Sequence, residues 1–550
     1  MNQPGQQKEY HNRTRILLIG AVLIIAYILL TTFVLRPLPD HFNSTTPAGG
    51  YSSDQCQTIW FFWWTDTALS HPDLSLYATD YIYYPHGTGL GYHLCPLTNM
   101  VALGFSALTG YAPNAPALFN FMVYFAFVLN GLASFLLIRV VTGRIGPAFI
   151  GSLFVTYAPY RLWHLDHLNL LSTGWGLLAI AFALMYFKAP QWRYLIGAVL
   201  AIVATFYVSL TNVMIAALFL LVCVIVFARR LLNHAERKRI LVGSIIGIVI
   251  ATILVLPGLL QLTHAAADWP VGWQEAEQHS PDLLDYIMPS SRQQSTGRGE
   301  AYLGWYLLGL ALVAVTIYRS KEVSRWGIVA AVFLILSLGP TLIVSDTRLL
   351  PGLMPYRWLF ETVPYFNLAR TPTRMIVAAQ WALAILVAFA LDGWMAAVRS
   401  TLRSHWRTVT VGLIYIASIA AIGFEYAARP IPLIPMQVPP VYNQVVSDPE
   451  VAVICDLPIR RQLQISNWYM YWQTYHERKA VNGYLTHHSA NATQLVDNIA
   501  TWQTVDSTQL EQLQAVGVDA AVIHQPNQPG QLIRLNEETG ARSESENSEP

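Results

Sequence analysis

Two polar clusters, far apart in the sequence, carry the residue types needed for acid–base chemistry on an anionic substrate. The first is Asp54, which lies just before an aromatic run that ends at Trp64. The second follows an apolar segment and contains Arg161, His164, Asp166, His167 and Asn169. A carboxylate can remove a proton from a hydroxyl group, and Arg and His side chains can bind a phosphate or orient an acceptor. The two clusters predict a reacting site if the fold brings them together.

Structural roles are the alternative for some of these residues. Ser53 or Asp54 can cap a helix, because oxygen atoms at a helix N-terminus accept hydrogen bonds from free backbone N–H groups. Arg161 can extend from a helix end toward water. Helical spacing places Arg161, His164 and Leu168 on one face, which leaves Asp166 with Asn169 on another.

Metal binding has weak support in the sequence. The spacing of His164, Asp166 and His167 is not a standard zinc signature. We therefore assign no metal ligand and no certain cofactor, and leave a divalent metal open. His86, in the aromatic turn 81–87, and His93 are further candidates for substrate contact. The alternative for each is an ordinary packed or solvated loop histidine.

A third cluster has the features of an anion site. The stretch 351–374 contains a short amphipathic helix around Tyr356–Thr362, followed by Arg370, Thr371 and Arg374. Thr371 is the expected N-cap of the next helix, with a proline in its first turn. Free backbone N–H groups and guanidinium donors together suit a lipid phosphate. Unspecific contact with anionic headgroups is the alternative.

The composition places most of the chain in a membrane. The 550 residues are 54% hydrophobic and 12% charged, whereas soluble proteins contain about 25% charged residues. The net charge of +1 gives no reason to expect nucleic acid as a partner. About eleven apolar segments have the length and composition of spanning helices. They cover residues 16–35, 117–138, 145–160, 170–187, 194–210, 212–228, 240–262, 302–318, 327–345, 375–395 and 408–427.

The basic residues predict the orientation of these segments. Lys and Arg gather before the first segment and in every second loop after it, which is typical of cytoplasmic loops. The N-terminus is then cytoplasmic, whereas the loop 36–116, the end of the third segment and the tail are external. The first segment lacks a small-residue cleavage site close behind it, so we expect a retained anchor. Asp54 and the second cluster thus share the external face.

The predicted domain organisation follows from these segments. Residues 1–428 form the transmembrane domain, in which the external loop 36–116 carries a surface helix at Asp54–Leu69 with its aromatic rings at headgroup level. A proline-rich linker covers 429–440. Residues 441–530 form a small external α/β domain, with strands at 451–457 and 518–523 and a helix at 508–516. Residues 531–550 are predicted to be disordered.

Cysteine usage leaves one question open. Cys56 and Cys95 fall in the same predicted external loop. They can form a disulfide if that compartment is oxidising, or remain free thiols packed among aromatic side chains.

Several short motifs resemble a known superfamily. The sequences DQCQTIWFFWW, YIYYPHG, YRLWHLDHLN and FNLARTPTR are similar to those of a group of prokaryotic multi-pass proteins in the GT-C superfamily of integral-membrane glycosyltransferases. The resemblance covers about residues 36–212 well, and 351–374 with part of the tail more loosely. It implies that Asp54 is the catalytic base and that Asp166 is the nearest match to a second acidic residue. The WWDYG-type signature of oligosaccharyltransferases is absent, which argues against transfer to protein asparagine.

The resemblance implies a reaction and its partners. A polyprenyl-phosphate sugar donor in the outer leaflet would place its phosphate near Arg161, Arg370 or Arg374, among the membrane lipids. Asp54 would activate a hydroxyl of a lipid or glycan acceptor, and the sugar would be transferred with inversion. Two alternatives remain, a lipid or polysaccharide transporter or flippase, and a non-catalytic scaffold with a partner-binding tail. The helix centres carry almost no charge, which argues against an ion-coupled pump.

Overall fold

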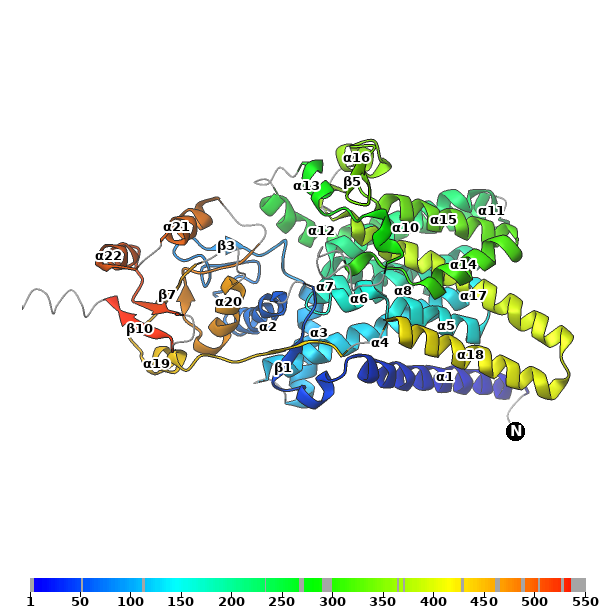
Figure 1. Cartoon of the computed structure of the whole chain (residues 1–550), viewed down its shortest axis with the longest axis horizontal. Helices are drawn as coiled ribbons and strands as arrows, with labels where there is room; N and C mark the ends of the chain where they lie inside the picture. Colours follow the sequence, from blue (N-terminus) through cyan, green and yellow to red (C-terminus); the bar gives the residue numbers. More distant parts are fainter. Residues whose placement is uncertain are drawn as a thin grey trace, which may run out of the picture.

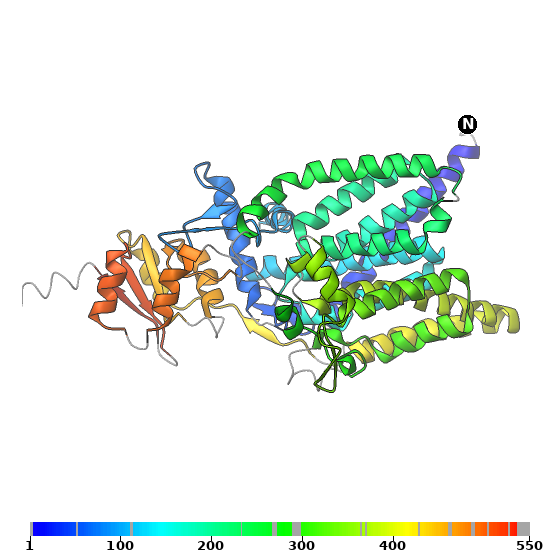
Figure 2. The same cartoon turned by 90° about the horizontal axis from the view of Figure 1, so that it is seen from above.

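The computed structural model describes residues 4–50, 53–110, 114–232, 234–266, 272–288, 299–363, 366–368, 371–426, 430–459, 465–485, 490–502, 505–525 and 529–535. A long helical body lies at one end of the molecule, and a smaller α/β region lies at the other (Figure 1). The N-terminus lies at the far end of the helical body from the α/β region in both views (Figures 1 and 2).

A helix occupies most of each predicted apolar segment, although the segment predicted at 327–345 is helical only to Ser337 and residues 342–344 form a strand. These helices are α1 (Pro4–Val34), α4 (Ala115–Thr142), α5 (Ile145–Thr156), α8 (Gly174–Lys188), α9 (Trp192–Val208), α10 (Leu210–Val226), α12 (Arg237–Ala266), α14 (Trp305–Ile317), α15 (Lys321–Ser337), α17 (Ile376–Thr401) and α18 (Ser404–Tyr426). Within the described residues, six stretches are long and apolar enough to cross a membrane: 14–34, 115–142, 168–188, 237–262, 372–401 and 404–426. Helices α9, α10 and α14 are apolar but shorter. The chain is thus a helical membrane protein, and the number of eleven spans stays a prediction.

Helix α17 forms the centre of the helical body. It packs against α4, α5, α14 and α15, and almost every side chain from Ile376 to Ala388 is buried. A helix that is apolar on all sides is expected in such a central position. Its many alanines allow neighbouring helices to approach closely.

The loops at the end of the helical body near the α/β region contain several short elements. They are η1 (Leu38–His41), α2 (Asp54–Ser70), β2 (Ala78–Thr79), β3 (Thr88–Gly89), α3 (Pro96–Thr109), α6 (Pro159–Trp163), α7 (Leu168–Leu171), α13 (Trp273–Gln278), η2 (Leu283–Tyr286), η4 (Gly299–Ala301), β4 (Leu342–Val344), β5 (Thr347–Leu349), α16 (Pro355–Thr362), η5 (Phe366–Leu368) and η6 (Pro372–Met375). Helix α11 (Ala228–Leu232) follows α10. The amphipathic helix predicted at Tyr356–Thr362 is α16.

The third predicted segment is interrupted. Helix α5 ends at Thr156 rather than near residue 160, because the residue before a proline disfavours helical backbone and Pro159 starts the separate helix α6. A turn at residues 164–167 then separates α6 from α7. The expectation of one continuous helical face for Arg161, His164 and Leu168 was therefore wrong.

The α/β region after residue 430 is built on a four-stranded sheet in the order β10-β9-β7-β8. Strands β7 (Val453–Leu457), β8 (Lys479–Ala480) and β9 (Ala520–Ile523) run in parallel, and β10 (Gln531–Arg534) is antiparallel to β9. The helices are α19 (Val441–Ser447), α20 (Ile465–His476), α21 (Ala490–Ala500) and α22 (Ser507–Ala515). The predicted strands and the helix near 508–516 are present. Strand β10 contradicts the disorder predicted from residue 531, and residues 536–550 lie outside the described part.

The proline-rich linker leads from the helical body to the α/β region (Figure 1). Strand β6 (Leu433–Pro435) pairs antiparallel with β1 (Thr45–Pro47), which follows the first helix. Asn120 on α4 donates to the backbone oxygens of Phe42 and Thr45 at 2.8 and 2.7 Å. The linker is thus held beside the chain that leads into α2.

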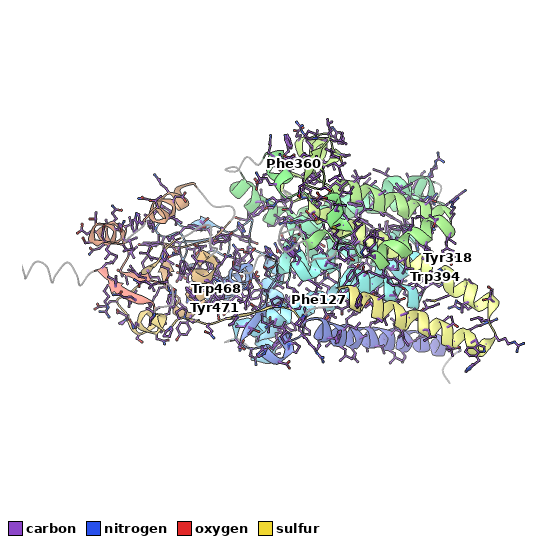
Figure 3. The ribbon with its side chains drawn as sticks, viewed as in Figure 1. Phe127, Tyr318, Phe360, Trp394, Trp468 and Tyr471 are labelled. Atoms are coloured by element: carbon purple, nitrogen blue, oxygen red, sulfur yellow. The ribbon has the colours of Figure 1, made fainter. Side chains whose placement is uncertain are left out.

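Helix α2 has the predicted bounds, but its aromatic side chains have a different environment. Trp60 and Trp64 are fully buried and stack with their centroids 5.8 Å apart. Trp60 Nε1 donates to Gln473 Oε1 at 2.7 Å, because α2 packs against α20. The expectation that this run lies at headgroup level was wrong. Figure 3 shows Trp468 and Tyr471 on the same helix α20.

Candidate active site

Asp54 and Asp166 meet on a single histidine. Asp54 Oδ2 lies 2.5 Å from His167 Nε2, and Asp166 Oδ1 lies 3.0 Å from His167 Nδ1. The side chain of Asp166 is fully buried, whereas those of Asp54 and His167 are 19% and 18% exposed. The two clusters that the sequence singled out are therefore in direct contact.

The local chain geometry places the three side chains. Asp54 is the first residue of α2, and Ser53 occupies the N-cap position without a side-chain cap bond. Capping therefore does not account for the position of the Asp54 carboxylate, which faces His167. His167 precedes α7 after the turn that follows α6. Gly49 lies against this turn, where a Cβ atom would be only 2.0 Å from Asp166 Oδ1.

The electrostatics favour an ionised pair. Burial raises the pKa of Asp54, but the charge and hydrogen bond of His167 and the amide of Asn467 outweigh it, so the pKa is lowered overall. Burial lowers the pKa of His167, but Asp54 and Asp166 outweigh it and raise that pKa to about 10. At neutral pH the imidazole is therefore a cation, and each of its N–H groups donates a hydrogen bond to one carboxylate.

The C-terminal region supplies a further contact to Asp54. Asn467 on α20 donates from Nδ2 to Asp54 Oδ1 at 3.1 Å and to Ser53 Oγ at 3.0 Å. Gln57 on α2 donates to the backbone oxygen of Tyr484 at 2.7 Å. The position of the Asp54 carboxylate thus depends on residues that follow the helical body in the sequence.

A second acid–histidine pair lies behind the first. His164 Nε2 is 3.2 Å from Glu300 Oε2, and both side chains are buried. His164 Nδ1 contacts the backbone oxygen of Tyr160 at 2.8 Å, so the proton of the neutral ring belongs on Nδ1. Burial lowers the pKa of His164 and raises that of Glu300. Burial therefore favours the neutral form of each group.

Arg161 is a buried cation near this pair. It is fully buried and donates to Thr173 Oγ1 at 2.7 Å. Its Nε and Nη1 atoms have no hydrogen-bond partner within the described residues. Arg161 and His164 are not among the residues that line the cavity at the site, so they lie behind its wall.

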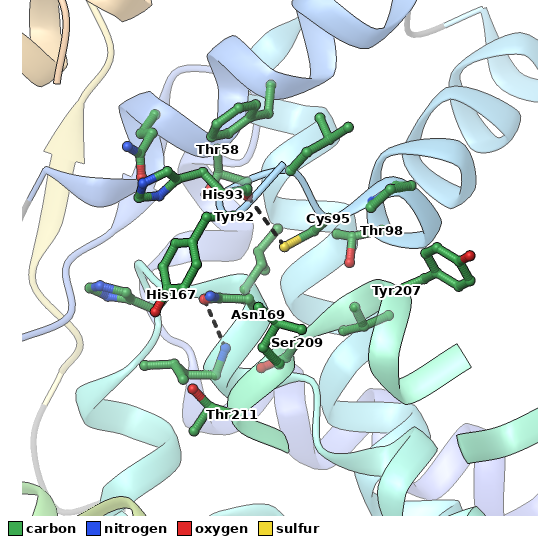
Figure 4. Close-up of a pocket in the computed structure, with 18 of the residues that line it drawn as sticks. Thr58, Tyr92, His93, Cys95, Thr98, His167, Asn169, Tyr207, Ser209 and Thr211 are labelled. Carbon is green, nitrogen blue, oxygen red and sulfur yellow. Dashed lines mark hydrogen bonds between the residues drawn. The ribbon is translucent and has the colours of Figure 1, made fainter. Parts of the chain in front are cut away.

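A cavity of about 300 Å³ adjoins the Asp54–His167 pair. Its volume is at the lower end of the range for small-molecule sites, roughly 300–1,000 Å³. Figure 4 shows Tyr92, His93, His167 and Asn169 around it, with Thr211 from the start of α10. The other polar or titratable residues that line it include Asp54, Thr58, Cys95, Asn99, Asp166, Ser209, His279, Arg374 and Tyr484.

Arg374 brings positive charge to the same cavity. It lies in η6, before α17, and Thr371 occupies the expected N-cap position, although without a side-chain cap bond. Arg374 Nη1 donates to Thr211 Oγ1 at 3.4 Å, and Nε has no hydrogen-bond partner in the described part of the chain. Arg370, the other arginine predicted to bind phosphate, lies outside the described residues.

Two other predictions concern His86 and a pair of cysteines. His86 is exposed and lines a separate surface hollow with Asp80 and Gly87, so the structure does not bring it to the cavity. Cys56 and Cys95 are free thiols. Burial raises the pKa of Cys95 to about 12, so its thiol is protonated at neutral pH.

Sequence reasoning missed several residues at this site. Asn467 and Glu300 have no recognisable motif around them. His93, the second loop histidine considered for substrate contact, does line the cavity. Asn467 contacts Asp54 although the two residues are 413 positions apart in the sequence, and no local sequence pattern indicates such a contact.

Comparison with solved structures shows the fold. The chain is similar to an oligosaccharyltransferase of Archaeoglobus fulgidus in complex with Zn and sulfate, with a TM-score of 0.53, 12% identity, and coverage of 91% of this chain and 67% of that one. A second structure, AglB of the same organism with an inhibitory peptide and a dolichol-phosphate, gives 0.49, 14%, 92% and 69%. ArnT of Cupriavidus metallidurans bound to undecaprenyl phosphate gives 0.49, 13%, 92% and 92%. The first likeness shows that the chain shares the fold of that protein, the GT-C fold.

The zinc in the first of these structures raises the question of a metal here. Asp54, Asp166 and His167 offer suitable donor types. However, both ring nitrogens of His167 contact carboxylates. Across the described ranges, no group of three or more His, Cys, Asp or Glu side chains is arranged to hold a metal ion. The residues as placed do not fit a metal centre.

Comparison by sequence identifies the family. No curated protein matches the chain. A family model described as a domain of unknown function, DUF6311, matches residues 17–402. This match spans more than half of the 550 residues, and the chain therefore belongs to the DUF6311 family.

Proposed function

We propose that this chain transfers a sugar from a polyprenyl-phosphate donor to a hydroxyl group of a lipid or glycan acceptor, with inversion, on the external face of the membrane. The observation that carries the proposal is the convergence of Asp54, His167 and Arg374 on one polar cavity. The GT-C fold shared with an oligosaccharyltransferase supports glycosyl transfer as the reaction class.

Asp54 is the proposed base. The acceptor oxygen attacks the anomeric carbon, its proton passes to Asp54, and the bond from that carbon to the phosphate oxygen breaks. A carboxylate with a lowered pKa is a weak base toward a free hydroxyl. The hydroxyl becomes strongly acidic once its oxygen begins to bond to the carbon, so a late proton transfer suits Asp54. General-base help of this kind contributes roughly 10²–10⁴-fold.

The phosphate leaving group needs positive charge more than it needs a proton. It departs with the electron pair of the broken bond, and nearby cations stabilise the charge that develops. Arg374 lines the cavity, and the raised pKa of His167 makes that ring a second cation. Asp166, hydrogen-bonded to the far nitrogen of His167, acts as a positioning residue for the ring.

The test uses full-length protein reconstituted in liposomes. These contain one polyprenyl-phosphate monosaccharide at a time and a mixture of lipid and glycan acceptors, and release of polyprenyl phosphate is measured. The variant is Asp54→Asn, which keeps the shape but removes the base. Asp66→Asn is the matched control, because Asp66 is an exposed carboxylate on the same helix.

We expect Asp54→Asn to lower turnover by roughly 10²–10⁴-fold and Asp66→Asn to leave it unchanged. Full turnover by a normally folded Asp54→Asn protein would overturn the assignment of the base. If wild type instead releases no polyprenyl phosphate from any donor but moves a lipid-linked sugar between the leaflets, that result would favour a flippase.

A further inference from the structure

A second cavity lies among the helices, away from the candidate active site. Its volume is about 430 Å³, and apolar side chains of α8, α9, α10 and α12 form nearly all of its lining. Leu195, Val199 and Ile240 form a buried floor. Leu221 and Ile248, on the two sides of the opening, are 54% and 66% exposed. The cavity is therefore a groove between α10 and α12, open at the outer surface of the helical body.

The groove and the active-site cavity use opposite ends of the same helices. The groove is lined by residues 195–202 of α9 and 237–251 of α12. The active-site cavity is lined by residues 206–208 of α9, together with Gly258 and Leu262 of α12. The groove therefore faces the membrane half that lies away from the active site. A ligand of the groove need not be the donor that reaches Asp54.

Positive charge lies at the far end of the groove. Arg237, the first residue of α12, belongs to its lining and is exposed. Lys238 follows it, and Arg229 and Arg230 lie on α11 close in sequence. Arg230 is paired with Glu322 at 2.6 Å, but within the described residues no carboxylate lies at ion-pair distance from Arg237 or Lys238. This end of the groove suits an anion.

We propose that the groove binds an anionic phospholipid of the adjoining leaflet, with an acyl chain between α10 and α12 and the headgroup phosphate at Arg237. The apolar lining accounts for the chain, and the unpaired basic residues account for the headgroup. Basic pockets between membrane helices bind anionic headgroups in this way. The site is independent of the proposed transfer reaction.

The test measures lipid binding rather than activity. Full-length protein is purified in detergent, and bound phosphatidylglycerol and phosphatidylethanolamine are counted by native mass spectrometry over a concentration series. Arg237→Gln removes the charge at the headgroup end. Ala198→Phe fills the groove from α9, where Ala198 belongs to the lining.

Two control variants are matched to these changes. Arg403→Gln removes another exposed arginine, between α17 and α18. Leu200→Phe enlarges a side chain on α9 that is 59% exposed and does not line the groove. The thermal unfolding midpoint of each protein checks that the fold is retained, and Arg237 is exposed, so its replacement leaves the packing intact.

We expect wild type to bind phosphatidylglycerol more tightly than phosphatidylethanolamine. Arg237→Gln should weaken phosphatidylglycerol binding by about fivefold, and Ala198→Phe should abolish the tightest bound lipid, whereas both controls match wild type. Equal binding of the two lipids, or unchanged binding in Arg237→Gln, would overturn the proposal. Displacement of the lipid by polyprenyl phosphate, or a stable dimer with an empty groove, would assign the groove to another occupant.

Discussion

Asp54 and Asp166 hold the imidazole of His167 from opposite sides, at 2.5 Å from Nε2 and 3.0 Å from Nδ1. One carboxylate comes from the start of α2 and the other from the turn between α6 and α7. Because both ring nitrogens face carboxylates, the ring is held as a cation with a fixed orientation. The position of each carboxylate is in turn fixed by the ring.

Replacement of His167 by glutamine tests the role of this cation. Glutamine keeps hydrogen-bonding capacity but carries no charge, so the phosphate leaving group loses a stabilising neighbour. We expect turnover in the liposome assay to fall by roughly 10²–10³-fold, with little change in protein yield. His86→Gln is the control, because His86 is exposed and lies at a separate hollow. Equal activity of His167→Gln and wild type would contradict the proposed role.

The ion pair of Asp54 and His167 also predicts that the stability of the protein depends on pH. The pKa of His167 rises from 6.5 to about 10 on folding, so its stabilisation is full below about 6.5 and is lost as pH rises through about 10. The pKa of Asp54 falls below 3.8, so its stabilisation is present above that value and is lost as pH falls through the folded pKa.

Thermal unfolding of wild type and His167→Gln, compared across pH, measures this effect. The difference in unfolding midpoint should be largest between about pH 4 and 6.5 and should shrink steadily toward pH 10. A difference that does not vary between pH 5 and 10 would show that His167 is neutral in the folded protein.

The helices could be predicted from sequence because both lipid and buried helix surfaces require apolar residues. The division of residues 194–228 into two helices was predicted, and Ser209 caps α10 by accepting from the backbone N–H of Asn212 at 3.2 Å. The aromatic run in α2 was misplaced for a physical reason. A membrane interface and a protein interface both favour large rings with a polar group, and sequence alone does not reveal that α20 covers Trp60.

The candidate site was predicted in part. Asp54, Asp166 and His167 carry the expected chemistry, and charge asymmetry alone placed them on one face. Their mutual contacts were not predicted, because the chain breaks at Pro159 and residues 164–167 form a turn instead of the expected helical face. Asn467 and Glu300 escaped notice, because their roles arise from packing between segments that are far apart in sequence.

Asn467→Asp tests whether the C-terminal region influences the pKa of Asp54, the proposed base. A second carboxylate would replace the amide that donates to Asp54 at 3.1 Å. Like charges at this distance raise the pKa of a carboxyl group, so the acid limb of the pH–rate profile should move to higher pH by about one unit or more. Asn498→Asp on α21, where Asn498 is exposed, should leave the profile unchanged. An unshifted limb in Asn467→Asp would mean that Asp54 does not titrate in that limb.

Gly49→Ala tests how closely the loop before α2 must approach Asp166. An added Cβ atom would lie 2.0 Å from Asp166 Oδ1 and 2.7 Å from the backbone oxygen of Trp163. Both contacts are too short, so either Asp166 or the loop must move, and the contact of Asp166 with His167 loosens. Misplacement of about 1 Å at a reacting centre costs about 10²-fold in rate, and turnover should fall accordingly. Gly104→Ala on α3 meets nothing within 4 Å and should retain full turnover with equal or higher thermal stability. If Gly49→Ala also retains full turnover, the position of Asp166 does not limit the reaction.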